Sequence, residues 1–221
     1  MLELVSTTAV SVRFGSRVAL DSIDLQIPAD GSIIGLFGRN GAGKSTLIRV
    51  ICGLINRHDG SVHTNGDIAY LPDRPMWYPW LRLSACIELG AQLWPDFDVA
   101  RAHTLLATLG LDERSRVREL SKGMSEQVHI AFTLARRCSL YVFDEPLAAV
   151  DPLTRDRVIE LIQRERQPGS TVLISTHLIA GLEALFDTVL VVDAGRVLLN
   201  APVDVLASPG SLEAQIKEVL A

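Results

Sequence analysis

The chain has 221 residues, of which 48% are hydrophobic, so it is long enough for one domain with an additional lobe and can fill a substantial core. Its formal net charge of −5 argues against a nucleic-acid-binding surface, which is normally basic. We therefore expect a protein that binds no nucleic acid. The sequence lacks the pattern of a signal peptide or of a membrane span, so we expect a cytoplasmic protein. Its three cysteines, Cys52, Cys86 and Cys138, are isolated in the sequence and are expected to be buried thiols.

The first predicted elements are antiparallel strands with one buried face. Apolar residues recur with period two in two consecutive segments, at Val10, Val12 and Phe14 and at Ile23, Leu25 and Ile27. We expect these strands to form an N-terminal sheet over the segment that follows. Alternation alone places Phe14 in the strand core.

A glycine-rich loop lies between an apolar run at 33–37 and a helical pattern at 47–54. Its residues are Gly38, Arg39, Asn40, Gly41, Ala42, Gly43, Lys44, Ser45 and Thr46. Glycines permit the tight turn and let backbone N–H groups approach phosphate oxygens, and the following helix directs its positive end to the same point. Lys44 supplies a cation for the outer phosphates, and the Ser45 hydroxyl can ligate Mg²⁺. The loop predicts a site for a triphosphate with its Mg²⁺.

The rest of the chain alternates between short buried strands and helices. A strand is expected at 68–71, a mostly helical segment from about 72 to 137, and short apolar runs at 140–143, 171–174 and 189–192. Such runs, flanked by polar turns, are typical of buried parallel strands. A short amphipathic helix is expected over 211–221. The fold class is therefore α/β.

Polar residues follow two of these runs. Asp144 and Glu145 end the run at 140–143, and ligands gather at the carboxyl ends of parallel strands. Asp144 can hold Mg²⁺, and Glu145 can accept a proton from a water that attacks the γ-phosphate. The alternative is that the pair caps the following helix or turn. His177 follows the run at 171–174 and can orient that water, or it is an ordinary surface or packing residue.

A second helix start suited to anions lies within the helical segment. Ser121, Lys122 and Gly123 precede a helix with Met124, Val128, Ala131 and Ala135 on one face.

Two phosphate-binding helix starts in one chain, with the acidic pair and the histidine, resemble the ATP-binding domain of ABC transporters. The resemblance extends over nearly the whole chain. It implies a P-loop NTPase core with an antiparallel β-subdomain over about 1–71 and 138–221, and a helical subdomain over about 72–137. It also implies ATP and Mg²⁺ as cofactors, ATP hydrolysis, and a homodimer or heterodimer at the cytoplasmic face of the membrane beneath integral membrane subunits. In that family each phosphate loop faces the partner's signature, so Ser121, Lys122 and Gly123 would contact the partner's ATP.

The resemblance assigns further positions, each with a local alternative. Phe14 would stack on adenine. Asp151 would connect the two sites of the dimer, although Asp151-Pro152 is also an ordinary helix start. Asp73 stands near the position where the family has a glutamine that serves Mg²⁺, and it either replaces that residue or is a simple turn residue after Pro72.

Aromatic residues are concentrated at the start of the helical segment. The resemblance implies that Trp77, Tyr78, Trp80 or Leu81 lines a groove for a cytoplasmic helix of the membrane subunit. The alternative is that the aromatic residues, including Trp94, fill the core of the helical segment. Lys122 and Met124 depart from the usual signature of the family. With these residues the signature is similar to those of ABC-2-like exporters of the bacitracin-resistance and Ytr types. We therefore expect an exporter. The alternatives are a soluble ATP-gated switch and a nucleotide-binding module that hydrolyses ATP slowly.

Overall fold

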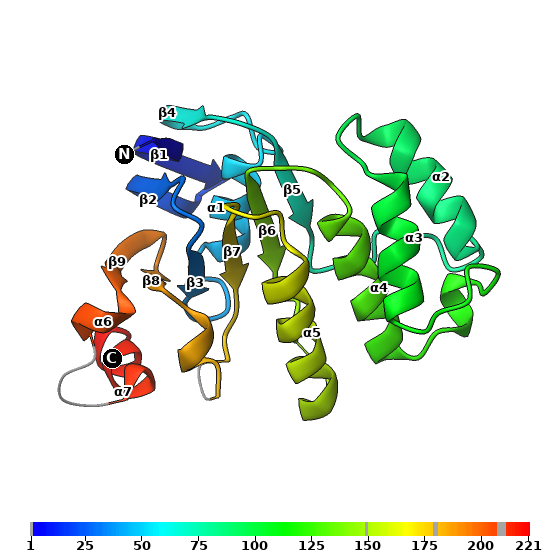
Figure 1. Cartoon of the computed structure of the whole chain (residues 1–221). Helices are drawn as coiled ribbons and strands as arrows, with labels where there is room; N and C mark the ends of the chain where they lie inside the picture. The colour runs from blue at the N-terminus through cyan, green and yellow to red at the C-terminus, as the bar shows by residue number, and fades with distance from the viewer. Residues whose placement is uncertain (1, 149, 179–180, 207–210) are drawn as a thin grey trace.

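Two β-sheets pack against helix α1 (Lys44–Ile51) from opposite sides in the computed structural model, which describes residues 2–148, 150–178, 181–206 and 211–221 (Figure 1). The larger sheet has the order β5-β6-β7-β3-β8-β9. Its strands are β5 (Ile68–Leu71), β6 (Leu140–Asp144), β7 (Thr171–Ser175), β3 (Ile33–Phe37), β8 (Thr188–Asp193) and β9 (Arg196–Pro202). The first five run parallel, and β9 is antiparallel to β8. This confirms the expected α/β class and the predicted strands, to which it adds β9.

The smaller sheet is antiparallel, as predicted, with the order β2-β1-β4. Its strands are β1 (Glu3–Phe14), β2 (Arg17–Pro28) and β4 (Asp59–Thr64). Val10 and Val12 are buried, but Phe14 is 54% exposed, so the core position that alternation predicts for it is wrong. Phe14 pairs with Arg17 at the turn of the hairpin, after a register shift that follows Val12. At that end of β1, the alternation of apolar residues no longer predicts which side chains are buried.

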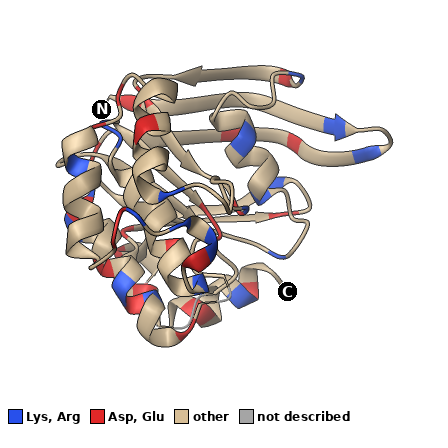
Figure 2. Cartoon of the chain, turned by 90° about the vertical axis from the view of Figure 1, so that its right-hand side faces the viewer, with Lys and Arg blue, Asp and Glu red and all other residues tan. Residues whose placement is uncertain are grey.

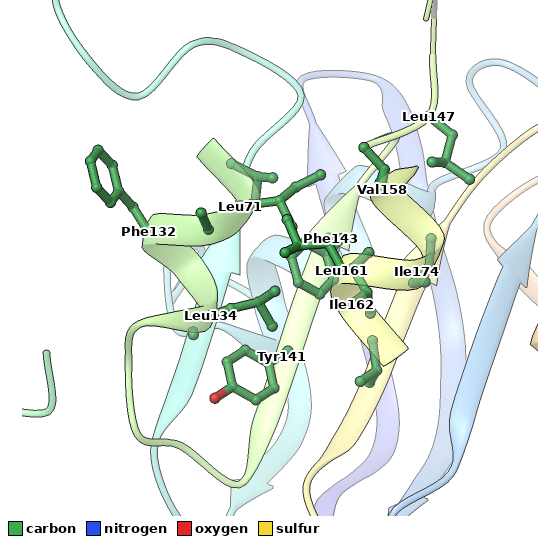
Figure 3. Close-up of a cluster of buried hydrophobic side chains, with 14 of the residues drawn as sticks. Leu71, Phe132, Leu134, Tyr141, Phe143, Leu147, Val158, Leu161, Ile162 and Ile174 are labelled. Carbon is green, nitrogen blue, oxygen red and sulfur yellow. The ribbon is translucent and has the colours of Figure 1, made fainter. Parts of the chain in front are cut away.

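The strands of the larger sheet contribute to a different apolar core on each face. Leu140 and Val142 belong to the core that contains α1, whereas Tyr141 and Phe143 belong to the other. In Figure 3, the rings of Tyr141 and Phe143 lie between Leu134 of α4 (Lys122–Leu134) and the side chains of α5 (Pro152–Glu165). Burial on both faces explains why these strands are continuous apolar runs. Because these strands are packed on both faces, the polar residues at their ends are held in fixed positions.

The helical segment lies beside β5 (Figure 1). It comprises α2 (Leu83–Leu93), α3 (Val99–Thr108), the 3₁₀ turn η1 (Val117–Glu119) and α4. Residues 72–82 form no helix, although the sequence predicts a mostly helical segment from about 72 to 137. Pro72, Pro75 and Pro79 explain the difference, because proline removes a backbone donor and disfavours helix at the preceding residue.

The last described elements are the 3₁₀ turn η2 (Glu183–Leu185), α6 (Val203–Leu206) and α7 (Leu212–Val219). Helix α7 buries Leu212 and Ile216 and is capped by Ser211, which confirms the predicted amphipathic helix. Arg39 of the glycine-rich loop donates a hydrogen bond to the Leu220 carbonyl, so the end of α7 lies beside that loop.

Charged residues of both signs are scattered over the helices and strands in Figure 2. Within the described ranges, no helix has the length and apolar character that a bilayer crossing requires. The three cysteines form no disulfide; Cys86 and Cys138 are buried as expected, whereas Cys52 is half-buried.

Candidate active site

The glycine-rich loop, the acidic pair and His177 meet at one edge of the larger sheet. The loop follows β3, Asp144 ends β6, and the segment with His177 follows β7. Strand β7 lies between β6 and β3 and is parallel to both. The carboxyl ends of these three neighbouring strands therefore bring segments that are far apart in sequence to one place.

Two glycines of the loop lie too close to neighbouring backbone to carry a side chain. A Cβ at Gly38 would lie 2.1 Å from the Val192 carbonyl oxygen, and one at Gly43 would lie 2.7 Å from the Ala19 carbonyl oxygen. Gly43 also has a φ of 113°, in the region that favours glycine. The loop thus requires glycine at both positions, and the turn leads directly into α1.

Lys44 is the buried cation of this site. Its ammonium donates to the Gly38 carbonyl at 2.8 Å and lies 3.6 Å from Oε1 of Glu145. Only 6% of the residue is exposed. A buried charge is costly unless it is paired, so these contacts hold the ammonium at the inner surface of the loop.

A cavity of about 300 Å³ opens above the loop. It is lined by residues 39–46 together with Phe14, Arg17, Ala19, Asp73 and Glu145. The exposed Phe14 ring therefore shares a cavity with the loop, as an adenine-stacking role requires. Sequence reasoning missed Arg17, whose guanidinium donates to the Gly41 carbonyl at 3.2 Å.

Asp144 is 1% exposed and has one satisfied and one unsatisfied carboxylate oxygen. Its Oδ1 accepts hydrogen bonds from Ser175 at 2.6 Å and from Ser45 at 3.2 Å. Its Oδ2 is buried and has no hydrogen-bond partner in the described structure. Burial raises the pKa of Asp144, and the two serine hydroxyls oppose that rise.

This donor set fits Mg²⁺. The unsatisfied Oδ2 needs a partner, and Mg²⁺ is bound in proteins by a few carboxylate and hydroxyl oxygens together with water and phosphate oxygens. Asp144 and Ser45 would hold the ion. Across the described ranges, no three His, Cys, Asp or Glu side chains cluster in a way that could enclose a metal, so water and phosphate oxygens have to complete the coordination.

Glu145 and His177 form a hydrogen-bonded pair at the mouth of the site. The His177 Nδ1 lies 2.9 Å from Oε2 of Glu145. The Glu145 backbone has a φ of +53°, which is uncommon for a residue other than glycine. Helix α5 is capped by Asp151, so the acidic pair does not cap this helix. The turn that follows the pair is closed by the Ala148 N–H and the Glu145 backbone carbonyl.

The structure places the signature outside the 300 Å³ cavity of its own protomer. Ser121 caps α4 by accepting a hydrogen bond from the Met124 N–H at 3.2 Å. A Cβ at Gly123 would lie 2.9 Å from Oγ1 of Thr154, whose hydroxyl donates to Asp151 at 2.6 Å. Asp151 also accepts a hydrogen bond from the Thr154 backbone N–H at 3.1 Å, so it caps α5 as its local pattern predicts. The two bonds from Thr154 lower the pKa of Asp151.

Ala149, two residues before Asp151 in the sequence, lies outside the described residues. On the predicted apolar face of α4, Val128, Ala131 and Ala135 are buried, but Met124 is 38% exposed. Met124 belongs to the first turn of α4, at the signature, which projects from the core.

Asp73 and Lys122 line a second cavity, of about 650 Å³, which also contacts Asp144, Glu145 and His177. Asp73 lies 3.7 Å from the Arg49 guanidinium, and both side chains are about two-fifths exposed. Asp73 is thus next to the site, and its nearest charged partner is an arginine.

The aromatic cluster divides into a buried and an exposed part. Trp77 is 6% exposed and packs edge to face against Phe132 and Trp94, so it does not line a surface groove. Tyr78 and Trp80 are 63% and 60% exposed, and their rings stack with centroids 4.6 Å apart. Leu81 packs partly buried against the core. Both proposed roles of the cluster therefore have residues that suit them.

Sequence reasoning missed Ser175 as a functional residue. It ends β7 directly opposite Asp144 on β6. The available signal was that both apolar runs end in a polar residue, but only the order of strands in the sheet makes these two residues neighbours.

The chain is similar to proteins of one known family. The profile of the family described as "ABC transporter" matches residues 20–148. The aliphatic sulfonates import ATP-binding protein SsuB of Rhodopseudomonas palustris (strain BisA53) is 38% identical over 201 residues, which cover 86% of this chain and 71% of that protein. The protein of the same name from Yersinia pestis is 33% identical over 233 residues, covering 97% of this chain and 84% of that protein. Both are named for import, so they give no support to the expected exporter branch.

Solved structures show the same fold. A structure described as the ATP-binding subunit of an ABC transporter superposes with a TM-score of 0.86 at 27% identity, covering 99% of this chain and all of that chain. A dimeric ATP-binding cassette in a post-hydrolysis state, bound to ADP and Pi, has a TM-score of 0.78 at 21% identity and covers 90% of this chain and 98% of its own. At 21% identity, the similarity to this second structure supports the fold alone.

Proposed function

Because this chain belongs to the ABC transporter family, whose ATP-binding subunits are transport-coupled ATPases that bind ATP with Mg²⁺, we propose that its catalytic residues are those gathered around Asp144 and Glu145. The observation that carries the proposal is the hydrogen-bonded pair of Glu145 and His177 beside the phosphate loop. Glu145 lines the 300 Å³ cavity, where the terminal phosphate of a nucleotide held by the loop would end, and both residues line the adjoining 650 Å³ cavity.

Each residue has a chemical task that its position supports. The loop N–H groups and Lys44 bind the β- and γ-phosphates, and Phe14 supports the base. Ser45 and Asp144 would hold Mg²⁺, which would neutralise negative charge that develops on the phosphates. Glu145 accepts the proton of the attacking water, and His177 orients the Glu145 carboxylate and the water through its hydrogen bonds.

We further propose that two such chains, or this chain and another of its family, complete each other's sites. Ser121 and Gly123 stand at the N-terminus of α4, where backbone N–H groups suit an anion, yet they do not line their own protomer's cavity. A partner's γ-phosphate gives that helix start a ligand. Asp151 accepts a hydrogen bond from Thr154, which packs against Gly123, and it would couple closure of one site to closure of the other.

The exposed pair Tyr78 and Trp80 is the proposed contact with the membrane subunits. Stacked aromatic rings with about three-fifths of their surface exposed offer apolar area that a partner helix can cover. The chain would then lie at the cytoplasmic face of the membrane, attached through this contact. We propose that the chain divides into a core over 1–71 and 138–221 and a helical part over 72–137. The proposed contact then lies on the helical part, next to β5.

Two observations point to opposite directions of transport. The signature with Lys122 and Met124 is similar to that of exporters, whereas the relatives matched above are named for the import of aliphatic sulfonates. We take import as the working direction because that similarity covers most of the chain, whereas the signature covers a few residues. Aliphatic sulfonates are the first substrates to test.

A transport assay separates these proposals from a soluble ATP-gated switch. Cells that lack this chain are supplied with the wild type or with Lys44→Ala, and uptake and efflux of a labelled aliphatic sulfonate are followed. ATP-dependent uptake that only the wild type restores supports a sulfonate importer. Restored efflux supports the exporter, and no effect on either flux argues against sulfonate as the substrate. Failure of the chain to copurify with membrane subunits would favour the switch.

A further inference from the structure

Ser175 is a fully buried hydroxyl residue between the two acids of the site. It is the last residue of β7, has 0% exposure, and is the register partner of Asp144 on β6. Most of the other residues of β7 are apolar and fill the core. A hydroxyl in such a place is costly unless it has partners, and this one has two.

Both partners belong to the acidic pair. The Ser175 hydroxyl donates to Oδ1 of Asp144 at 2.6 Å and accepts a hydrogen bond from the Glu145 backbone N–H at 2.9 Å. A serine hydroxyl has one proton, and an ionised carboxylate can only accept, so the direction of both bonds is fixed. The single hydroxyl therefore sets the position of the Asp144 carboxylate and of the Glu145 backbone together.

The contact with Asp144 decides which carboxylate oxygen is available. Because Ser175 and Ser45 occupy Oδ1, Oδ2 is the oxygen left without a partner. Without the Ser175 hydroxyl, the Asp144 carboxylate could rotate and lose this distinction between its two oxygens.

The contact with Glu145 supports an uncommon backbone conformation. Glu145 has a φ of +53°, a left-handed conformation that is sterically unfavourable for a residue other than glycine. Its N–H is held by the Ser175 carbonyl at 3.1 Å as well as by the hydroxyl. This conformation carries the Glu145 side chain toward His177 and Lys44 rather than along the line of the strand.

We propose that Ser175 is a positioning residue that couples the metal-holding carboxylate of Asp144 to the catalytic carboxylate of Glu145. The inference rests on the roles given above to those two acids. It goes beyond them because Ser175 itself lies behind the site and lines neither cavity. Its hydroxyl makes the geometry of the base depend on the geometry of the metal ligand.

The test compares three variants with the wild type. Ser175→Ala removes the hydroxyl, and Ser175→Thr keeps it on a β-branched residue that suits a strand. Ser170→Ala is the matched control, because Ser170 is also buried, immediately precedes β7, and donates its hydroxyl to the Gln167 carbonyl at 2.6 Å outside the site. The measurements are kcat and KM for ATP, the Mg²⁺ concentration that half-saturates nucleotide binding, and the thermal midpoint.

We expect Ser175→Ala to lower kcat about 10- to 100-fold with little change in KM, since a hydrogen bond to a charged group is lost. Measured with a fluorescent ATP analogue in a Glu145→Gln background, where no hydrolysis interferes, half-saturation by Mg²⁺ should need several-fold more ion. Ser175→Thr should restore both values. Ser170→Ala should lower the thermal midpoint by an amount similar to Ser175→Ala and leave kcat and the Mg²⁺ requirement unchanged.

The proposal is overturned if Ser175→Ala keeps the wild-type kcat and Mg²⁺ requirement, or if Ser170→Ala changes them equally. If Ser175→Ala does not fold, Ser175→Cys, which fills the space with a weaker donor, carries the same expectations. Failure of the proposed function is distinguishable, because Glu145→Gln would then hydrolyse ATP as well as the wild type does.

Discussion

The imidazole Nδ1 of His177 lies 2.9 Å from Oε2 of Glu145, while the other carboxylate oxygen of Glu145 lies 3.6 Å from the Lys44 ammonium. The carboxylate is thus held between a cation of the phosphate loop and an imidazole that follows β7. Both contacts limit the rotation of the Glu145 carboxylate.

Removing the imidazole should slow hydrolysis and leave nucleotide binding intact. We expect His177→Ala to lower kcat about 100-fold or more, since a positioned proton-transfer partner contributes on the order of 10²–10⁴. His103→Ala is the matched control: its Nδ1 lies 2.6 Å from Glu113 in an exposed pair remote from the site. Steady-state phosphate release and equilibrium ATP binding check this. An equal loss in both variants would contradict the role given to His177.

The loop glycines give a prediction about stability. Alanine at Gly38 would place its Cβ 2.1 Å from the Val192 carbonyl oxygen, so the backbone must move, and we expect a loss of about 3 kcal/mol or more. Gly53→Ala is the control, because Gly53 also has a positive φ, +69°, but nothing lies within 4 Å of a Cβ there. It should cost about 1 kcal/mol. Thermal unfolding should rank Gly38→Ala well below Gly53→Ala, and equal midpoints would show that close packing at Gly38 is unimportant.

Glu126 on α4 predicts a pH dependence of stability. Burial raises its pKa to about 7, and Lys122 opposes the rise. Because the folded chain binds this proton more tightly than the unfolded chain, the Glu126 contribution to the free energy of unfolding falls as the pH rises from about 4.5 to 7. Glu126→Gln removes this penalty, so it should be more stable than the wild type at pH 8 and no more stable at pH 4.

Chemical denaturation at both pH values measures this difference, with Glu88→Gln, an exposed site on α2, as control. The neighbouring His129 acts in the opposite sense: burial lowers its pKa to about 4, so its contribution falls as the pH drops below about 6.5. The difference between wild type and Glu126→Gln isolates the glutamate. A difference that is independent of pH would contradict the prediction.

Two tryptophans near each other in sequence should behave differently. Trp77→Ala removes a buried ring from contact with Phe132 and Trp94 and should cost about 3–5 kcal/mol of stability. Trp80→Ala removes an exposed ring and should change stability by less than about 1 kcal/mol. It should instead weaken assembly with the membrane subunits, measured by copurification. Unchanged assembly and coupling in Trp80→Ala would remove the proposed contact.

Much of the fold could be predicted because several signals are local. The strands of the larger sheet are buried on both faces, so apolar runs reveal β3, β6, β7 and β8 directly. The phosphate loop is a continuous segment whose glycines, lysine and serine have fixed spacing. Asp144, Glu145 and His177 each follow a predicted strand, so their meeting could be expected from the α/β pattern.

The remaining features depend on tertiary structure. Phe14 follows the alternation of β1 but lies beside the hairpin turn, where no core covers it. The role of Ser175 requires β7 to lie next to β6, which no local pattern specifies. Glu126 and His129 occupy α4, for which the sequence predicts only that Met124, Val128, Ala131 and Ala135 share one face. The burial of Glu126 and His129 follows from the packing of α4 and could not be read from its sequence.

The most direct test of the central claim, that Glu145 is the catalytic carboxylate of an ATP-closed dimer, is a comparison of wild type and Glu145→Gln with Mg²⁺ and ATP. Phosphate release and molecular mass in solution are measured on the same samples, with Asp73→Ala alongside to report whether that acid serves Mg²⁺. We predict that the wild type hydrolyses ATP, while Glu145→Gln binds ATP, releases phosphate at least about 100-fold more slowly, and accumulates as a dimer. Glu145→Gln that hydrolyses at the wild-type rate, or that binds ATP and stays monomeric while the wild type turns over, would contradict it.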